Sequence, residues 1–201
     1  MPKPSELVTE ATQCLPPLMK AHGYKKHRRN FTKRTGESTA VLGIVSSTFN
    51  DHRTAQFYID VGVYIPAIVQ RSTIGDLKRE PAHNVTTINQ CTWTQDLSAL
   101  AGTPQGSWEV MGTSPCEQIN AEVFTMVKDV GIPWLEENVH LENFLNWLTT
   151  QTGFGAADTL WKFDRKEEAH HCLLRLPNRP NRPWGPTNQA RVDEWLRRHP
   201  L

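Results

Sequence analysis

The densest cluster of charge in this 201-residue sequence is a run of cationic side chains, which could bind an anion. Six of the ten residues from 25 to 34 are cationic, namely Lys25, Lys26, Arg28, Arg29, Lys33 and Arg34. Lysine and arginine beside phosphate oxygens supply much of the affinity of proteins for nucleic acids, and they pair equally well with an acidic protein surface. This basic strip also has a purely structural interpretation, as a solvated helix end and edge strand whose cations complement the helix dipole and discourage aggregation.

Two aromatic residues accompany the basic strip, Tyr24 and Phe31. Surfaces that bind single-stranded nucleic acids combine cations with exposed aromatic side chains on which the bases stack. We expect Tyr24 and Phe31 to face the core instead. The strip alone therefore leaves both an acidic protein and a nucleic acid open as partners.

A second set of candidate residues lies on a strand predicted over residues 56–65. Its core face is predicted to carry the apolar side chains Phe57, Ile59, Val61 and Val63. The alternate positions Tyr58, Asp60 and Tyr64 then form a partly solvated face that is a candidate for binding. Asp60 could form a carboxylate pair with Glu109 of another strand, but the sequence does not bring the two together.

No motif of catalysis or cofactor binding is present. The sequence lacks the nucleophile elbow, the phosphate-binding loops and the zinc-binding H-E-x-x-H pattern. The run His170-His171-Cys172 contains zinc-binding residue types, but adjacent residues on a helix project about 100° apart and cannot readily share one ion. We therefore predict no catalytic residue, no metal site and no cofactor, which favours a binding protein over an enzyme.

Residues 161–201 combine arginine with tryptophan, two residue types that are enriched at the centres of protein interfaces. We expect Trp161 and Trp195 to pack back on the main domain. Trp184 is flanked by Pro183 and Gly185, and we predict that it is exposed and available for binding.

Overall charge and cysteine use set further limits. The formal net charge is +1, so no global field would draw the chain onto nucleic acid or an anionic membrane. The four cysteines are scattered without a C-x-x-C pair, and the N-terminus has no apolar leader. These features predict free thiols, a cytoplasmic location and no association with a membrane.

The elements that must position these residues begin with helices. Residues 5–23 have helical spacing interrupted by Pro16-Pro17, which predicts two short helices or one kinked helix, capped by Ser5 and ended by Gly23. An antiparallel meander follows, with strands predicted over residues 31–35, 39–49 and 56–65, and two more over 84–93 and 107–111.

The second half is predicted to be helical. A helix capped by Ser114, with Pro115 at its first position, should end at Gly131, and a new element should begin at Ile132. Further helices are predicted over residues 140–150, 156–174 and 187–198. A stiff proline-rich connector over residues 177–186 should separate the last two.

Three segments together resemble a known bacterial family. Residues 15–33 pass from a helix end through Gly23-Tyr24-Lys25-Lys26 into a strand at Phe31, residues 56–64 form the strand Gln-Phe-Tyr-Ile-Asp-Val-Gly-Val-Tyr, and residues 132–135 read Ile-Pro-Trp-Leu. In this order they are similar to the family catalogued as domain of unknown function 4304, over residues 5 to about 150. Asp60 stands where the family pattern has asparagine. The resemblance implies a helix-flanked antiparallel sheet and brings no established activity.

The sequence thus predicts an α+β fold, with an antiparallel sheet of about five strands flanked by helices and a helical C-terminal extension. The predicted domains are an α+β core over residues 1–152 and an extension over residues 153–201 that packs on it. The predicted function is a non-enzymatic cytosolic protein-binding module, of the class that includes bacterial immunity proteins that neutralise toxins and proteins of defence systems. The alternative is a nucleic-acid-binding protein that uses the basic strip.

Overall fold

The computed structural model of the chain describes residues 3–36, 38–48, 50, 54–71, 84–103, 106–111, 116–176 and 185–201. By the contacts within the chain, these residues form two compact units. The first runs to Pro66 and resumes from 84 to His140, and the second holds 67–71 and Leu141–Leu201. The domain boundary predicted at residue 152 stays a prediction.

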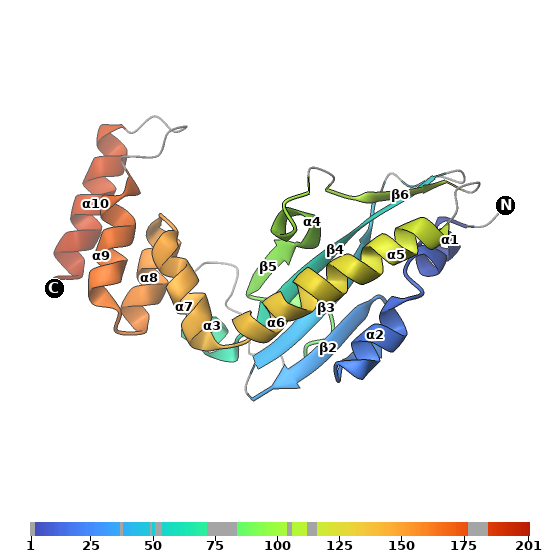
Figure 1. Cartoon of the computed structure of the whole chain (residues 1–201). Helices are drawn as coiled ribbons and strands as arrows, with labels where there is room; N and C mark the ends of the chain where they lie inside the picture. The colour runs from blue at the N-terminus through green and yellow to red at the C-terminus, as the bar shows by residue number, and fades with distance from the viewer. Residues whose placement is uncertain are drawn as a thin grey trace. The chain divides into compact units, whose positions relative to one another are not determined.

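The first unit is built on one antiparallel sheet (Figure 1). Its strands are β1 (Lys25–His27), β2 (Asn30–Thr35), β3 (Ser38–Ser46), β4 (Thr54–Tyr64), β5 (Trp93–Asp96) and β6 (Trp108–Met111). They lie in the order β1-β2-β3-β4-β5. Strand β6 pairs with the same edge of β4 as β5 does, but β5 lies along the C-terminal half of β4 and β6 along its N-terminal half. The predicted α+β fold and the meander are confirmed, with β1 as an additional edge strand.

Strand β4 places its apolar residues on the helix-covered face, as predicted. Phe57, Ile59, Val61 and Val63 are each 0% exposed. This strand is contacted by helices α1 (Pro4–Ala11), α4 (Leu97–Leu100) and α6 (Ile132–Asn138). Tyr64 was predicted to lie on the solvated face, but this is wrong, because its side chain is only 4% exposed. The next residue, Ile65, is also buried, and its amide donates to Thr92 Oγ1 at 3.1 Å.

The N-terminal residues form two short helices, as the Pro16-Pro17 pair predicts. They are α1 (Pro4–Ala11) and α2 (Leu15–Ala21). Helix α1 begins one residue before Ser5, so the predicted Ser5 cap is wrong and Lys3 occupies the cap position. Gly23 ends α2 as predicted, with φ of +82°, a conformation that glycine adopts without steric cost.

A long helical segment crosses the sheet without a break at Gly131 (Figure 1). It consists of α5 (Cys116–Met126), a π-helical turn η2 (Val127–Gly131) and α6 (Ile132–Asn138). The predicted helix end at Gly131 is therefore wrong, whereas α6 begins at Ile132, where a new element is predicted. A Cβ on Gly131 would lie 3.2 Å from Leu97 Cδ1 of α4 and 3.5 Å from Val61 Cγ1 of β4, so glycine lets this helix approach both elements closely. The wider turn before Pro133 accommodates a residue that cannot donate a backbone hydrogen bond.

The strand predicted over residues 84–93 is wrong for all but its last residue. A 3₁₀ turn η1 (Ile88–Gln90) precedes β5, and Gln90 Oε1 accepts hydrogen bonds from the amides of Thr86 and Thr87. Ile88 packs on the second face of the sheet at two glycines. A Cβ on Gly43 would lie 2.8 Å from Ile88 Cβ, and one on Gly62 would lie 2.8 Å from Ile88 Cδ1.

The second unit is helical. Its elements are α3 (Pro66–Arg71), α7 (Leu141–Thr150), α8 (Phe154–Lys162), α9 (Lys166–Leu174) and α10 (Pro186–Arg198). Pro66, the first residue of α3, is counted with the first unit. The single helix predicted over residues 156–174 is wrong, because Asp164 with φ of +62° turns the chain between α8 and α9. Trp161 and Trp195 pack edge to face with ring centroids 5.8 Å apart.

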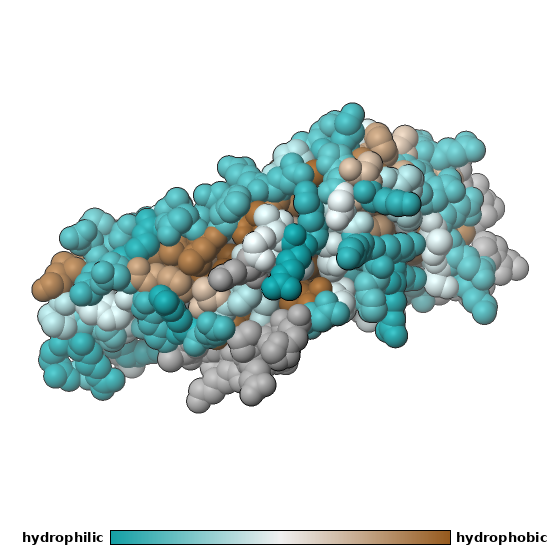
Figure 2. Space-filling view, turned by 90° about the horizontal axis from the view of Figure 1, so that it is seen from below, coloured by the Kyte–Doolittle hydropathy of each residue, from teal (hydrophilic) through white to brown (hydrophobic). Residues whose placement is uncertain are grey.

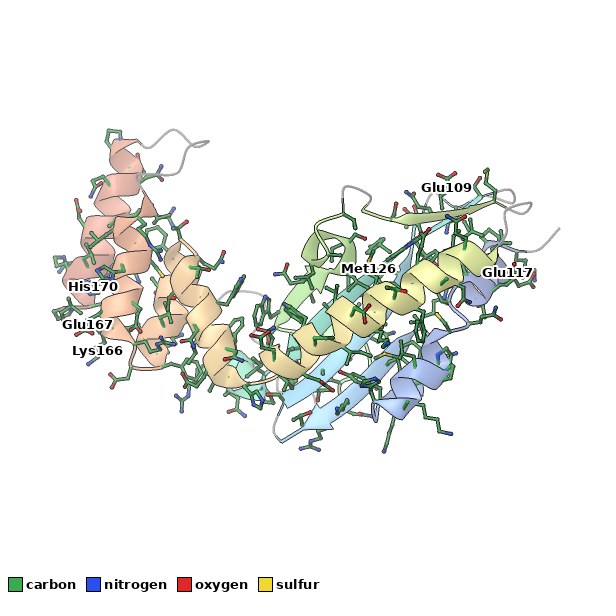
Figure 3. The ribbon with its side chains drawn as sticks, in the orientation of Figure 1. Glu109, Glu117, Met126, Lys166, Glu167 and His170 are labelled. Atoms are coloured by element: carbon green, nitrogen blue, oxygen red, sulfur yellow. The ribbon has the colours of Figure 1, made fainter. Side chains whose placement is uncertain are left out.

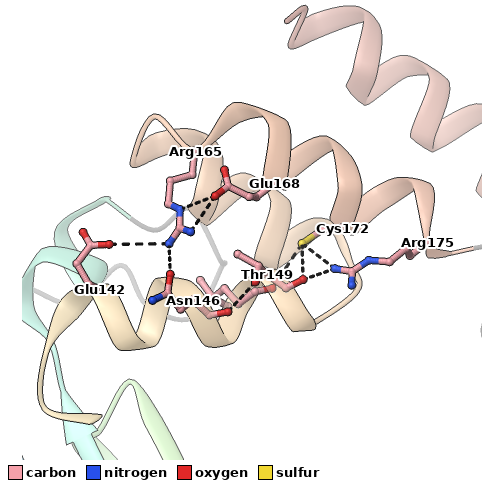
Figure 4. A network of polar contacts seen from close by, with 8 residues as sticks. Glu142, Asn146, Thr149, Arg165, Glu168, Cys172 and Arg175 are labelled. Atoms are coloured by element: carbon pink, nitrogen blue, oxygen red, sulfur yellow. Dashed lines mark hydrogen bonds and ion pairs between the residues drawn. The ribbon is translucent and has the colours of Figure 1, made fainter. Parts of the chain in front are cut away.

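Arg165 fastens the start of α9 to α7 (Figure 4). Its guanidinium donates to Asn146 Oδ1 at 2.8 Å and to Glu168 Oε1 at 2.8 Å, and it lies 3.9 Å from Glu142 Oε2. Planar guanidinium groups suit such multiple contacts because their donors are fixed in one plane. The network therefore links α7 to the start of α9.

Gly43 tests the packing of the η1 segment on the sheet. We predict that Gly43→Ala lowers the free energy of unfolding by about 1–3 kcal/mol, or the melting temperature by about 3–10 °C, because the new methyl group overlaps Ile88. Gly106→Ala is the matched control, since nothing lies within 4 Å of its Cβ position. Thermal unfolding followed by circular dichroism measures both; equal melting temperatures for the two variants would contradict the packing.

Candidate functional site

The basic strip does not form one continuous surface. In the β1–β2 hairpin, Lys25 pairs with Thr32 and Lys26 with Phe31. Because side chains alternate along a strand, Lys26 and Lys33 lie on the helix-covered face with Phe31. Lys25 and Arg34 lie on the opposite face, so the sheet divides the strip between two surfaces and a turn.

The turn of the hairpin forms one wall of a small pocket beside α1 and α2. The pocket encloses about 220 Å³ and is lined by Lys26, Arg28 and Arg29, the group called here the cationic corner. Polar atoms come from Thr9, Thr12 and Gln13, and apolar lining comes mainly from Val8, Phe31 and Ile44. The surface around α2 and this hairpin edge is largely hydrophilic in the view from below (Figure 2).

The cations of the corner are not neutralised from within the unit. Among the described residues, no carboxylate forms an ion pair with Lys26, Arg28 or Arg29; Arg29 donates to Ser46 Oγ. Lys33 differs, since its Nζ lies 3.4 Å from Glu136 Oε1 and 5.5 Å from the centroid of the Tyr24 ring. Of the strip, the corner is therefore the part that combines unpaired charge with a concave surface.

Arg28 has an unusual backbone conformation. Its φ is +54°, in the left-handed region that costs a residue other than glycine roughly 1–2 kcal/mol. Hairpin turns require this region, but glycine and asparagine meet the requirement at lower cost. Arginine at this position therefore strains the backbone, and it places a charged side chain at the pocket.

The two aromatic residues of the strip face the core, as predicted. Tyr24 is 4% exposed and Phe31 is 1% exposed. Neither is accessible to a nucleic acid base. The hairpin therefore offers cations without the exposed rings on which single-stranded nucleic acids stack.

The second face of the sheet holds the other predicted residues. Tyr58 and Asp60 are both half-buried there. Asp60 lies opposite Gly43 on β3 and Asp96 on β5. Burial, followed by repulsion from the Asp96 carboxylate, raises the pKa of Asp60 to about 6.

Asp96, rather than Glu109, is the carboxylate that accompanies Asp60. Glu109 pairs with Gln56, four residues from Asp60 along β4 and thus about 13 Å away. The sequence signal for Asp96 was its position before a short apolar run, where its Oδ1 caps α4 (Leu97–Leu100) by accepting from the Ala99 amide at 2.9 Å. One carboxylate of this pair is therefore engaged in capping α4.

The remaining candidates do not join either surface. Tyr64 is buried, and Trp184 lies outside the described residues, as do Ser114, Pro115 and all but the last two residues of the predicted proline-rich connector. His170 Nε2 lies 2.7 Å from the carbonyl oxygen of His199, whereas the buried Cys172 thiol donates to the Leu148 carbonyl at 3.4 Å. In the described part of the chain, no group of three or more His, Cys, Asp or Glu side chains is placed to hold a metal ion.

Asp60 gives the sheet a pH-dependent stability. Its pKa is about 6 in the folded chain and near 3.8 when unfolded, so the folded state alone retains the proton between these values. Stability therefore falls as pH rises from about 4 to about 6. We predict that Asp60→Asn removes this fall and leaves the chain more stable above pH 6 by about 1 kcal/mol, or about 2–4 °C, after allowance for the half-exposed position.

Melting temperatures measured from pH 4 to pH 8 test this prediction. Glu109→Gln is the matched control, because it removes an exposed carboxylate from the same sheet. If the Asp60→Asn profile fell in parallel with that of the unaltered chain, the assignment of this pH dependence to Asp60 would be wrong.

The comparisons with known proteins add one finding to this geometry. A search of curated proteins and a search of solved structures each found no match. Among the described residues, no helix has the length and apolar character needed to cross a membrane. Residues 15–137 match the family described as a domain of unknown function, DUF4304. This match includes α2, the whole sheet and most of α6, and because it covers more than half of the 201 residues, the chain belongs to the DUF4304 family.

Proposed function

We propose that the protein is a non-enzymatic binding module whose cationic corner holds an acidic segment of a partner protein. The observation that carries this proposal is the pocket of about 220 Å³ at which Lys26, Arg28 and Arg29 meet without a carboxylate partner among the described residues. A pocket of this size fits one or two acidic side chains rather than a whole ligand. The apolar lining contributed by Phe31 and Ile44 strengthens ion pairs by excluding water.

The strain at Arg28 supports a role in binding. Backbone strain persists where the surrounding structure enforces it, and it concentrates at functional sites. Glycine would fit the turn at lower cost, so the stability of the turn does not account for arginine. Its guanidinium supplies paired donors that match the geometry of a carboxylate.

An acidic protein segment fits these observations better than nucleic acid does. The sheet separates Lys25 and Arg34 from the corner, which breaks the row of cations that would follow a phosphate backbone. The aromatic residues of the hairpin are buried. The edge strand β1 is only three residues long and carries two lysines, which disfavours addition of a partner strand.

Within this class we propose a role as an immunity protein that neutralises a toxin, or as part of a defence system, by analogy with other small α+β binding proteins. All four cysteines are free thiols, which supports a reducing cytoplasm as the place of action. Nucleic-acid binding through the basic strip is the alternative function.

Reversal of charge at the corner tests the proposal. We predict that Arg28→Glu with Arg29→Glu abolishes recovery of the protein partner when the tagged chain is isolated from extracts of its own cells after nuclease treatment. Lys25→Glu with Arg34→Glu is the matched control, since it makes the same change of charge on the opposite face of the same hairpin. Mass spectrometry of the co-purified proteins measures both.

Two outcomes would contradict the proposal. Loss of the partner in both variants would show that the overall charge of the hairpin, rather than the corner, governs binding. Recovery of RNA or DNA only without nuclease, with binding that weakens steeply as salt rises, would favour the nucleic-acid alternative.

Arg28→Gly separates the structural and functional roles of this residue. Relief of the left-handed strain should raise the melting temperature by about 1–3 °C, while recovery of the partner falls. Asp164→Gly is the matched control, because Asp164 is the other described residue besides glycine with a positive φ, and it lies outside the corner. A lower melting temperature for Arg28→Gly, or undiminished recovery of the partner, would show that Arg28 serves the turn alone.

A further inference from the structure

A larger groove lies at the other edge of the same sheet, between α4, β6 and α5. It encloses about 690 Å³, within the range of about 300–1,000 Å³ that is usual for ligand pockets. Its apolar lining includes Ala101, Trp108, Met126 and Val130. Trp108 is fixed by its stack on Phe57 of β4, with ring centroids 5.5 Å apart. The groove therefore has a rigid base to which the flexible Met126 side chain can add an adaptable surface.

The rim of this groove is acidic. Among the described residues that line it, the charged ones are Glu122 and Asp129, both exposed carboxylates, and none is lysine or arginine. They are seven residues apart on the segment formed by α5 and η2, about 10 Å along the helix axis, and both line this groove. Neither forms an ion pair with a described residue; Glu122 only accepts a hydrogen bond from Gln118 Nε2 at 3.0 Å. The neighbouring Lys128 Nζ instead lies 6.0 Å from the centroid of the Phe124 ring.

The groove is separate from the cationic corner. The opposite side of α5 packs on α1, where Asn120 Nδ2 donates to the Glu10 carbonyl at 3.1 Å, and on the turn after α1, where the Cys14 thiol donates to the Asn120 carbonyl at 3.4 Å. In Figure 1, α2 and β2 lie on one side of the long α5–α6 segment and α4 and β6 on the other. Occupation of one surface leaves the other open.

We propose that this groove binds a basic amphipathic helix from a partner protein, with apolar side chains on the floor and lysine or arginine side chains at Glu122 and Asp129. Helices that enter grooves use apolar residues repeated every three or four positions. Cations two turns apart on such a helix match the spacing of the two carboxylates. The acidic rim disfavours the acidic segment proposed for the corner, so the two surfaces select partners of opposite charge.

The test uses a defined probe and a signal from the groove itself. The probe is a 14-residue peptide of leucine and lysine with leucine at helical spacing, and its counterpart has every lysine replaced by glutamate. The whole chain carries ¹³C-labelled methionine methyl groups. We expect the Met126 methyl resonance to shift on addition of the lysine peptide, while that of the buried Met19 stays unchanged, and we expect neither to shift with the glutamate peptide.

Charge reversal on the rim then measures its contribution. Glu122→Lys with Asp129→Lys should weaken binding of the lysine peptide about tenfold, from the loss of two ion pairs and the added repulsion. The matched control is Glu109→Lys with Glu117→Lys, which makes the same change of charge on β6 and α5 outside the groove lining. Figure 3 shows both control residues together with Met126, and Glu109 points away from α5. The control should change binding less than twofold.

A bulky substitution tests the apolar floor of the groove without altering its charge. Ala121 is exposed on α5 and lines the groove, so Ala121→Trp should fill the groove and abolish the Met126 shift while the helix still forms. Three results would overturn the proposal: an unmoved Met126 resonance at a saturating peptide concentration, equal weakening by the rim and control variants, or equal binding of the two peptides. None of these results bears on the cationic corner, because the corner is assessed separately by recovery of its own partner.

Discussion

The first unit depends on burial of one face of β4. Four of its side chains, Phe57, Ile59, Val61 and Val63, are removed from water beneath the helices, and together they contribute on the order of 6–12 kcal/mol of transfer free energy. Their alternation fixes the register, because a slip of one residue would turn all four toward solvent. One edge of β4 pairs with β3, and the other is divided between β5 and β6. The corner and the groove thus lie at opposite edges of a sheet whose register is set by one strand.

This register decides which neighbours in sequence become neighbours in space. Six cations within ten residues suggest one binding surface, yet pairing of β1 with β2 sends Lys25 and Arg34 to one face and Lys26 and Lys33 to the other. Strand pairing also brings distant residues together: Asp60 and Asp96 are thirty-six positions apart in the sequence and lie opposite each other in the sheet. A cluster of charge in the sequence of a strand therefore identifies a candidate segment, while pairing identifies the surface.

The sequence predicted those parts of the fold that follow from local rules. Pro16-Pro17 divides a helix, and alternation of apolar residues identifies β2, β3 and β4, because both signals lie within one element. The family resemblance, built on residues 15–33, 56–64 and 132–135, is confirmed. Failures occurred where a tertiary contact overrides the local signal. Gly131 reads as a helix end but serves close packing on Leu97, and residues 84–92 read as a strand but cross a sheet face that Gly43 and Gly62 leave open.

The sequence predicted which cationic residues form the candidate site, but it did not predict the pocket that they line. The pocket at Arg28 and Arg29 exists because α1 and α2 lie beside the hairpin turn, and the acidic groove exists because β6 joins the same edge of β4 as β5. A net charge of +1 conceals this separation of unlike charges across one sheet. Four strand spacings, about 19 Å, separate β1 from β5. A partner with an acidic and a basic segment spaced to reach both surfaces would therefore gain affinity from their effective concentration, beyond what either surface supplies alone.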